Sequence, residues 1–220
     1  MNPKNLLGPR VRDGTSRKKP SVFGRLYVIS APSGAGKSTI CKAVLERMPD
    51  LKYSVSHTTR SPRGSEENGV DYHFVSKDDF LAGIQNGTWA EWALVHGNYY
   101  GTSADFIDES LSRGSDVLLD IDVKGAKQIL KRYPDSITIF ITPPSFAALR
   151  ARLIKRGTDT HAVIEQRLVN AEEEMTQRET YRHVIINDRL NEAIAAVSAI
   201  IDSARAIGGG APPCLPAKTP

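Results

Sequence analysis

The chain has 220 residues and a mass of 24.1 kDa, a length that suits one compact domain or one domain with small insertions. Charged residues make up 25% and hydrophobic residues 40%, and this ordinary globular composition excludes a wholly disordered or fibrous protein. No run of about 18 apolar residues occurs, so we expect no membrane-spanning helix and no membrane partner. The two cysteines, Cys41 and Cys214, make no disulfide framework, which favours a reducing, cytoplasmic setting.

The net charge of +4 is concentrated at the two ends of the chain. Residues 1–24 hold six basic residues and one acidic residue, and residues 208–220 add one lysine. The segment between them therefore carries a net charge of −2, which argues against a nucleic-acid partner despite the isoelectric point of about 9.1. Both ends also lack a hydrophobic period, so we predict two disordered tails, 1–24 and 208–220, around one folded domain at 25–207.

Taken in chain order, apolar stretches of strand length alternate with helical patterns. Runs rich in β-branched residues predict buried strands at 26–29, 117–119, 137–141 and 184–186. Helical patterns fill the intervals at about 37–48, 123–133, 145–156, 161–180 and 189–206. This alternation predicts an α/β fold with a doubly wound parallel sheet.

Two regions interrupt this alternation. Residues 55–107 are richer in glycine, aromatic residues and charge, which predicts a small mixed α/β insertion on a core formed by 25–54 and 108–207. Residues 150–170 are polar and rich in arginine, and we interpret them as a short lid that could move.

A glycine-rich turn lies between the first predicted strand and the first predicted helix. It matches the phosphate-binding P-loop, G-x-x-x-x-G-K-[ST], except that Ala31 replaces the first glycine. Gly34 and Gly36 allow backbone N–H groups to turn toward phosphate oxygens, and Lys37 can bridge the β- and γ-phosphates. The Ser38 hydroxyl is suited to Mg²⁺, the expected cofactor. The residues expected to bind the nucleoside triphosphate are Ala31, Pro32, Ser33, Gly34, Ala35, Gly36, Lys37, Ser38 and Thr39.

Two aspartates end the next buried strand. Carboxylates at the C-terminal end of a strand in such a sheet face the ligand crevice, and Asp120 could hold Mg²⁺ there through water. Asp122 suits the ligand crevice and the N-cap of the following helix equally well, so both roles stay open.

The insertion holds the residue types that bind a phosphate monoester and a base. Arg60 and Arg63 lie three residues apart on a turn stiffened by proline, a spacing suited to clamping a phosphate. Tyr72 and Tyr100 add phenol donors flanked by glycines, and Glu91 sets a carboxylate among aromatic residues. The histidines show no metal-ligand spacing.

Together these motifs resemble those of bacterial guanylate kinases. The resemblance covers about residues 25–205 and rests on the motifs SAPSGAGKST, TTRSPR, GVDYHF, GNYYGT and LDID. It implies a P-loop NTPase-type fold with a GMP-binding insertion, and transfer of the γ-phosphoryl group from ATP to GMP and dGMP with Mg²⁺. The predicted partners are therefore the small molecules ATP and GMP, whereas the oligomeric state is not predicted.

The resemblance also implies a set of site residues. The phosphate of GMP is expected at Arg60, Arg63, Tyr72 and Tyr100. The guanine is expected at Ser56, Glu91, Thr102 and Asp122, with Asp120 also on the GMP side. The ATP phosphates are expected to meet the lid residues Arg152, Arg156 and Arg167, and the adenine to lie near Asn187. Catalysis is assigned to Lys37, Arg60, Arg156 and Arg167.

Glu91 also has a chemical logic of its own. An ionised carboxylate only accepts hydrogen bonds, and guanine presents two adjacent donors, N1–H and the 2-amino group. Adenine has a lone pair at N1 and no 2-amino group, so it would leave the carboxylate unpaired. Sites built on such hydrogen bonds can discriminate by roughly 10⁴–10⁵.

Two alternative functions fit parts of the sequence. A P-loop kinase for another small phosphate acceptor would share the P-loop but would not need Glu91 with Tyr72 and Tyr100. A catalytically inactive guanylate-kinase-like module that binds partner proteins would be expected to have a degraded P-loop, whereas Lys37 and Ser38 are intact here.

Overall fold

The structure is a computed structural model that describes residues 23–95, 97–157 and 160–208. Residues 1–22 and 209–220, which make up most of the two predicted tails, lie outside the described residues, as does Cys214. The folded domain begins slightly before the predicted boundary, because the backbone N–H of Gly24 donates to the carbonyl of Leu111 at 2.9 Å.

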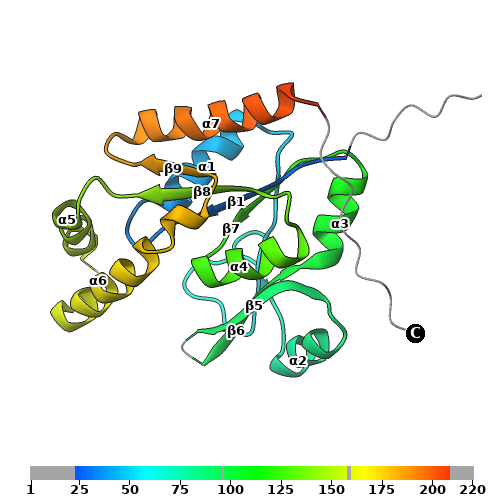
Figure 1. Cartoon of the computed structure of the whole chain (residues 1–220). Coiled ribbons are helices and arrows are strands. Elements are labelled where there is room, and N and C mark those ends of the chain that lie inside the picture. Colours follow the sequence, from blue (N-terminus) through cyan, green and yellow to red (C-terminus); the bar gives the residue numbers. More distant parts are fainter. Residues whose placement is uncertain (1–22, 96, 158–159, 209–220) are drawn as a thin grey trace, which may run out of the picture.

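Five parallel strands form the central sheet (Figure 1). In chain order they are β1 (Leu26–Ser30), β2 (Lys52–Tyr53), β7 (Val117–Asp120), β8 (Ile137–Thr142) and β9 (His183–Ile186). Their spatial order is β2-β7-β1-β8-β9, so the chain winds outward from β1 in both directions. The predicted fold class and the four predicted strands are confirmed. The sequence did not predict β2, which has only two residues.

Helices cover both faces of this sheet. The side chains of Tyr27 and Ile29 pack with α1 (Lys37–Arg47) and α7 (Leu190–Ala206) on one face. Leu26 and Val28, which alternate with them along β1, pack with α3 (Ala104–Ser112) and α4 (Val123–Arg132) on the other. A strand buried on both faces needs such an uninterrupted apolar run, and all five residues of β1 are buried.

The insertion forms a second, smaller sheet and one helix. The sheet consists of β3 (His57–Thr58), β4 (His73–Phe74), β5 (Trp89–Val95) and β6 (Asn98–Ser103), in the order β4-β3-β6-β5. The helix is α2 (Lys77–Gln85). The β3–β4 pair is parallel and the other two pairs are antiparallel. α3 continues from β6 into the core and crosses the predicted boundary at residue 107.

The arginine-rich segment forms two helices beside the phosphate loop, α5 (Phe146–Arg156) and α6 (His161–Met175). They pack together through Leu149, Leu153, Ile164 and Ala171. The prediction of one helix over 161–180 was wrong at its end, because α6 stops at Met175 and a separate 3₁₀ turn follows at Arg178–Thr180.

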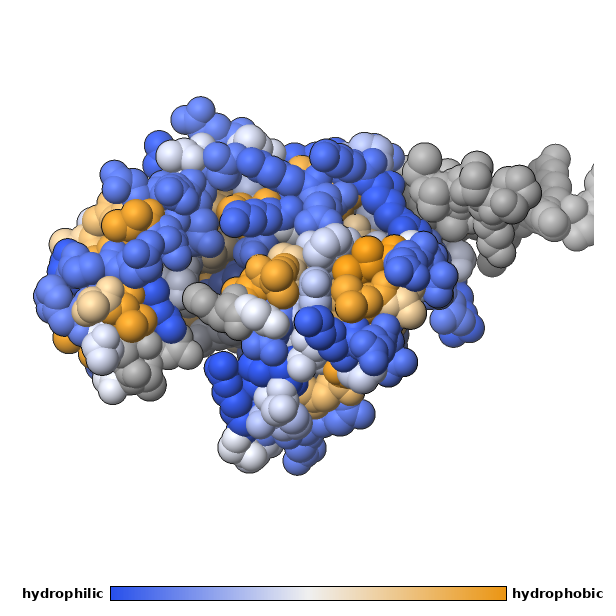
Figure 2. All heavy atoms as spheres, turned by 90° about the horizontal axis from the view of Figure 1, so that it is seen from below, coloured by the Kyte–Doolittle hydropathy of each residue, from blue (hydrophilic) through white to orange (hydrophobic). Residues whose placement is uncertain are grey.

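Most of the face shown in Figure 2 is hydrophilic. On the face shown in Figure 2, hydrophobic side chains gather in a few separate patches among hydrophilic ones. Within the described ranges, no helix is both long enough and apolar enough to cross a membrane.

Candidate active site

The phosphate loop joins β1 to α1 and surrounds a cavity of about 550 Å³, which we call the donor cavity. Gly34 and Gly36 have φ angles of 90° and 94°, a region that glycine adopts far more readily than other residues. No side chain caps α1, so the N–H groups of its first turn are available to an anion. The residues that line the cavity are Ala31, Pro32, Ser33, Gly34, Gly36, Lys37, Ser38, Thr39, Arg152 and Leu153.

Asn187 and Arg152 brace this loop from behind. The Asn187 side-chain amide donates to the carbonyl of Ala35 at 2.7 Å, and its backbone carbonyl accepts from Nη2 of Arg152 at 2.7 Å. Nη1 of Arg152 is buried and has no hydrogen-bond partner among the described residues. A phosphate oxygen in the donor cavity would satisfy that group. Ala35 is fully buried and Asn187 is 5% exposed, so little of the Asn187 side chain is open to a ligand. Its contact with adenine stays a prediction.

Helix α6 meets the loop at Ser33. Nη1 of Arg167 lies 3.4 Å from the Ser33 hydroxyl oxygen. Two turns later, the Glu174 carboxylate faces the Ser33 backbone N–H, and burial together with the nearby Asp122 raises the Glu174 pKa above its ordinary value. The sequence analysis did not single out Glu174. Arg156 ends α5, but its side chain lies outside the described atoms, so its predicted role stays a prediction.

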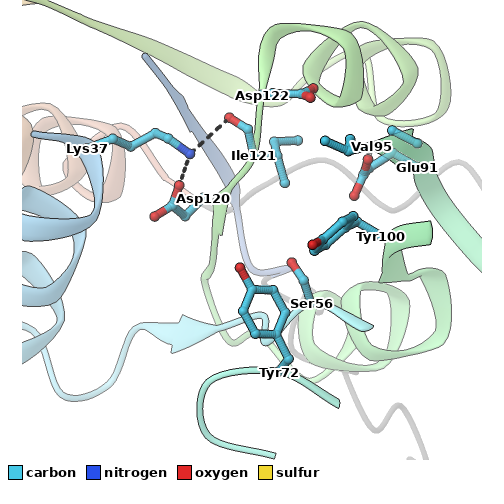
Figure 3. A pocket seen from close by; sticks show the side chains of 10 residues that line it. Lys37, Ser56, Tyr72, Glu91, Val95, Tyr100, Asp120, Ile121 and Asp122 are labelled. Atoms are coloured by element: carbon cyan, nitrogen blue, oxygen red, sulfur yellow. Dashed lines mark hydrogen bonds and ion pairs between the residues drawn. The ribbon is translucent and has the colours of Figure 1, made fainter. Parts of the chain in front are cut away.

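Lys37 lies where the donor cavity meets a second cavity of about 200 Å³, which we call the acceptor cavity. Its ammonium group forms an ion pair with the Asp120 carboxylate and lies 3.4 Å from the carbonyl of Ile121. In Figure 3, Lys37 and Asp120 lie on one side of the acceptor cavity and Glu91 on the other. The residues that line this cavity are Lys37, Ser56, Tyr72, Glu91, Ala93, Val95, Tyr100, Asp120, Ile121 and Asp122.

Glu91 is a buried acid, with 7% of the residue exposed. The Thr102 hydroxyl donates to its Oε1 at 2.6 Å. Burial raises the pKa of Glu91 to about 7, and the neighbouring Asp122 acts in the same direction, whereas the bond from Thr102 opposes the shift. Thr102 has no exposed surface, so in this structure it reaches the cavity only through Glu91.

Asp122 fulfils the structural role that the sequence left open. Its Oδ1 accepts the backbone N–H of Gly125 at 2.7 Å and so caps α4. Asp122 also lines the acceptor cavity, and its guanine contact stays a prediction.

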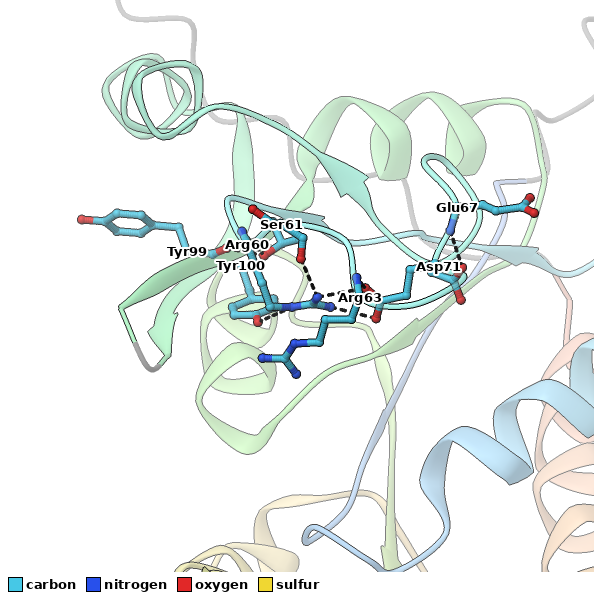
Figure 4. A network of polar contacts seen from close by, with 9 residues as sticks. Arg60, Ser61, Arg63, Glu67, Asp71, Tyr99 and Tyr100 are labelled. Carbon is cyan, nitrogen blue, oxygen red and sulfur yellow. Dashed lines mark hydrogen bonds and ion pairs between the residues drawn. The ribbon is translucent and has the colours of Figure 1, made fainter. Parts of the chain in front are cut away.

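A network of polar contacts holds Arg60 in place (Figure 4). Two of its nitrogens donate to the two carboxylate oxygens of Glu66, each at 2.9 Å, and Nε donates to the Tyr100 hydroxyl at 3.3 Å. The guanidinium carbon lies 5.3 Å from the ring centre of Tyr72. Glu66 also accepts the backbone N–H of Arg63, itself an exposed residue, at 2.8 Å. These contacts bring three of the four predicted phosphate ligands together around Arg60.

Comparisons with known proteins agree with this arrangement. The family model described as guanylate kinase matches residues 23–204. The chain belongs to the guanylate kinase family.

Individual relatives support the family assignment over most of the chain. A guanylate kinase of Cupriavidus metallidurans is 47% identical over 83% of this chain and 84% of its own length. One of Geobacter metallireducens is 44% identical over 83% of this chain and 90% of its own length. A crystal structure of guanylate kinase from Anaplasma phagocytophilum gives a TM-score of 0.69 at 33% identity, covering 84% of this chain and 87% of that chain. The resemblance seen in the sequence is thereby confirmed.

The sequence analysis missed three contacts, two of which join different elements. Glu66 holds Arg60, Glu174 faces Ser33, and Gly125 lies against Glu91. The Glu174 and Gly125 contacts carry no spacing signal, because the fold brings the two residues of each pair together, whereas Glu66 lies six positions from Arg60 in the same loop. A carboxylate near the predicted phosphate arginines was the only available indication of Glu66.

Proposed function

We infer that the protein is an ATP:GMP phosphotransferase, which transfers the γ-phosphoryl group of ATP to GMP and yields ADP and GDP. The observation that carries this inference is a buried carboxylate, Glu91, facing a cavity that meets the P-loop cavity at Lys37. A kinase that phosphorylates a guanine nucleotide needs a group that binds the base close to a loop that binds phosphate. Here Lys37 lines both cavities.

Glu91 supports guanine as the base of the acceptor. In its ionised form the carboxylate can accept N1–H and the 2-amino group together, one on each oxygen. The bond from Thr102 fixes the orientation of the carboxylate. The 2′-hydroxyl of the sugar plays no part in this recognition, so we propose that dGMP is a substrate as well.

The phosphate of GMP is proposed to bind at Arg60, Arg63, Tyr72 and Tyr100. Arg60 supports this assignment because Glu66 and Tyr100 fix the position of its guanidinium. A phosphate monoester has its second pKa near ~6, so its oxygen is already a nucleophile at neutral pH and needs no general base. The acceptor side therefore has to position and neutralise the phosphate rather than deprotonate it.

The phosphates of ATP are proposed to bind in the donor cavity. Lys37 neutralises the transferring group, and the unpartnered Nη1 of Arg152 and the side chain of Arg167 approach from the lid. We propose that Arg156 joins them when α5 and α6 close over the loop. Closure would also exclude water, which would otherwise compete with GMP as the acceptor.

We propose Mg²⁺ as the cofactor, held by the Ser38 hydroxyl and, through water, by Asp120. The described residues contain no group of three or more His, Cys, Asp or Glu side chains that could hold a metal by itself. The Ser38 hydroxyl and the Asp120 carboxylate fit Mg²⁺, which usually keeps several waters and binds through one or two protein oxygens and the phosphates of the substrate. When bound, Mg²⁺ would neutralise charge on the β- and γ-phosphates.

An ADP-release assay tests this function directly. With ATP and Mg²⁺, we expect rapid ADP release with GMP and dGMP and less than about 1% of that rate with AMP, CMP, UMP or TMP. Equal turnover of AMP would contradict the guanine assignment, and no turnover of any monophosphate would favour a non-catalytic module. A Lys37→Met variant serves as the control for contaminating kinases.

A further inference from the structure

The second oxygen of the Glu91 carboxylate lies directly against helix α4. Oε1 is held by Thr102, whereas Oε2 lies only 2.7 Å from the position that a Cβ on Gly125 would occupy. Real Cβ atoms essentially never approach another heavy atom so closely, so any side chain at residue 125 would displace the carboxylate. The carboxylate therefore lies between a hydroxyl donor and a glycine.

The backbone of α4 does not itself require a glycine at this position. Gly125 is the third residue of the helix and is not among the glycines with positive φ. Glycine is one of the least favourable residues in a helix interior, and alanine is the most favourable. The next nearest group to a Cβ here, Oδ1 of Asp122, would lie at 3.5 Å, an ordinary contact. The contact that excludes a side chain is therefore the one with Glu91.

A second contact prevents the strand from moving aside. Gln128, one turn after Gly125 on α4, donates from Nε2 to the carbonyl of Trp92 at 2.9 Å and accepts the Trp92 backbone N–H on Oε1 at 3.2 Å. Trp92 is the neighbour of Glu91 on β5. Because this pair ties the strand backbone to the helix, a side chain at residue 125 would have to push the carboxylate rather than the strand.

We propose that Gly125 is a specificity-determining residue for the acceptor, because its missing side chain sets the position from which Glu91 presents both oxygens to guanine. This inference rests on the proposed guanine-binding role of Glu91. The glycine also lets the carboxylate lie against the first turn of α4, where the helix dipole favours an anion. Gly125 thus acts through Glu91 and is a positioning residue rather than a catalytic one.

The variant Gly125→Ala tests the proposal through its separate effects on the two substrates. The displaced carboxylate loses one or both hydrogen bonds to guanine, so we expect the KM for GMP to rise at least tenfold and the KM for ATP to change less than twofold. The melting temperature should not fall, since alanine favours the helix and the carboxylate can move. Lys127→Ala, an exposed change on the same helix, should leave both KM values unchanged.

A cycle with Glu91→Asp distinguishes displacement of the carboxylate from damage to the helix. Aspartate shortens the side chain by one methylene, so Gly125→Ala should raise the KM for GMP less than twofold further in that background. Folding gives a second comparison. If Gly125→Ala fails to fold alone but folds together with Glu91→Asp, the clash with Glu91 is the cause. An unchanged GMP KM in folded Gly125→Ala, or a full multiplicative effect or loss of folding in the double variant, overturns the proposal.

The same measurements separate this inference from the function on which it rests. If Glu91→Gln leaves the KM for GMP unchanged, the guanine assignment of Glu91 fails, and the role of Gly125 fails with it. If Glu91→Gln raises that KM and Gly125→Ala does not, only the role of Gly125 fails.

Discussion

The donor and acceptor cavities meet at Lys37, yet they are built from different groups. The donor cavity is lined largely by consecutive residues of one loop, and its binding groups are backbone N–H groups and cationic side chains. The acceptor cavity draws its lining from α1, β5, β6, the end of β7 and three loops, and it contains a buried acid, Glu91.

This difference matches what each cavity is proposed to recognise. A triphosphate offers the same oxygens whatever the base, so a glycine-rich turn and a few cations suffice. A guanine must be distinguished from other bases by its hydrogen-bond donors, which requires an acceptor shielded from water. The Glu91 carboxylate is therefore buried, although burial disfavours its charged form.

Removing the charge of Lys37 should give the largest effect and should fall on the rate. We expect Lys37→Met to lower kcat/KM by about 10³ or more, since the charge on the transferring group is then poorly neutralised. The dissociation constant for GMP should change far less, because Arg60 and Glu91 remain in place. Steady-state kinetics and a GMP titration check this, with the melting temperature as a control for folding. A loss below tenfold would remove Lys37 from the catalytic role.

The acceptor cavity should be the pH-sensitive half of the site. Only ionised Glu91 can accept both guanine donors, and its pKa is about 7. Affinity for GMP should therefore fall as the pH drops through that value, by about tenfold between pH 8 and pH 6. The ATP affinity of the donor cavity should change much less over this range. Glu91→Gln corrects for the ionisation of the substrate phosphate, and an equally steep pH profile in that variant would contradict the assignment.

The same pKa has a consequence for stability. Because the folded state raises the Glu91 pKa above its ordinary value of 4.5, it binds more protons than the unfolded state between pH 4.5 and about 7. The contribution of this group to stability therefore decreases as the pH rises through that window. Glu91→Gln removes the buried charge and can keep the bond from Thr102, so at pH 8 its melting temperature should be no lower than that of the wild type.

A smaller effect is expected from the support of Arg60. Glu66→Gln removes the charge that fixes the guanidinium and should raise the KM for GMP by about threefold to tenfold, with the KM for ATP unchanged. Glu67→Gln, a change to the next residue, whose side chain is exposed, is the matched control. If both variants have the same KM for GMP, Glu66 does not position Arg60.

The donor cavity and the central sheet show which features the sequence could predict and which it could not. The P-loop was predictable because its chemistry lies in consecutive residues, and β1 was predictable because a strand buried on both faces must be apolar throughout. By contrast, β2 pairs over only two residues, Lys52 and Tyr53, too short a stretch for any periodicity. The end of α6 at Met175 likewise carries no glycine or proline signal.

In the acceptor cavity the sequence predicted residue types better than it predicted contacts. Glu91, and Arg60 next to the cavity residue Tyr100, were identified from their residue types and from the family motifs, but the groups that position them were not. Thr102 was expected to face guanine, and that contact stays a prediction; in the structure Thr102 is fully buried and its hydroxyl donates to Glu91. Gly125 lies 34 positions from Glu91 in the sequence, and only the packing of α4 on β5 brings the two together.

Comparing GMP with inosine monophosphate gives the most direct test of the claim that Glu91 binds the guanine base. The inosine base keeps N1–H and lacks the 2-amino group, so it removes one of the two bonds to the carboxylate. In the wild type, kcat/KM for GMP should exceed that for inosine monophosphate by about 10- to 100-fold, as expected for one hydrogen bond to a charged group. In Glu91→Gln the ratio should fall to about threefold or less. The same ratio in both proteins would contradict the account.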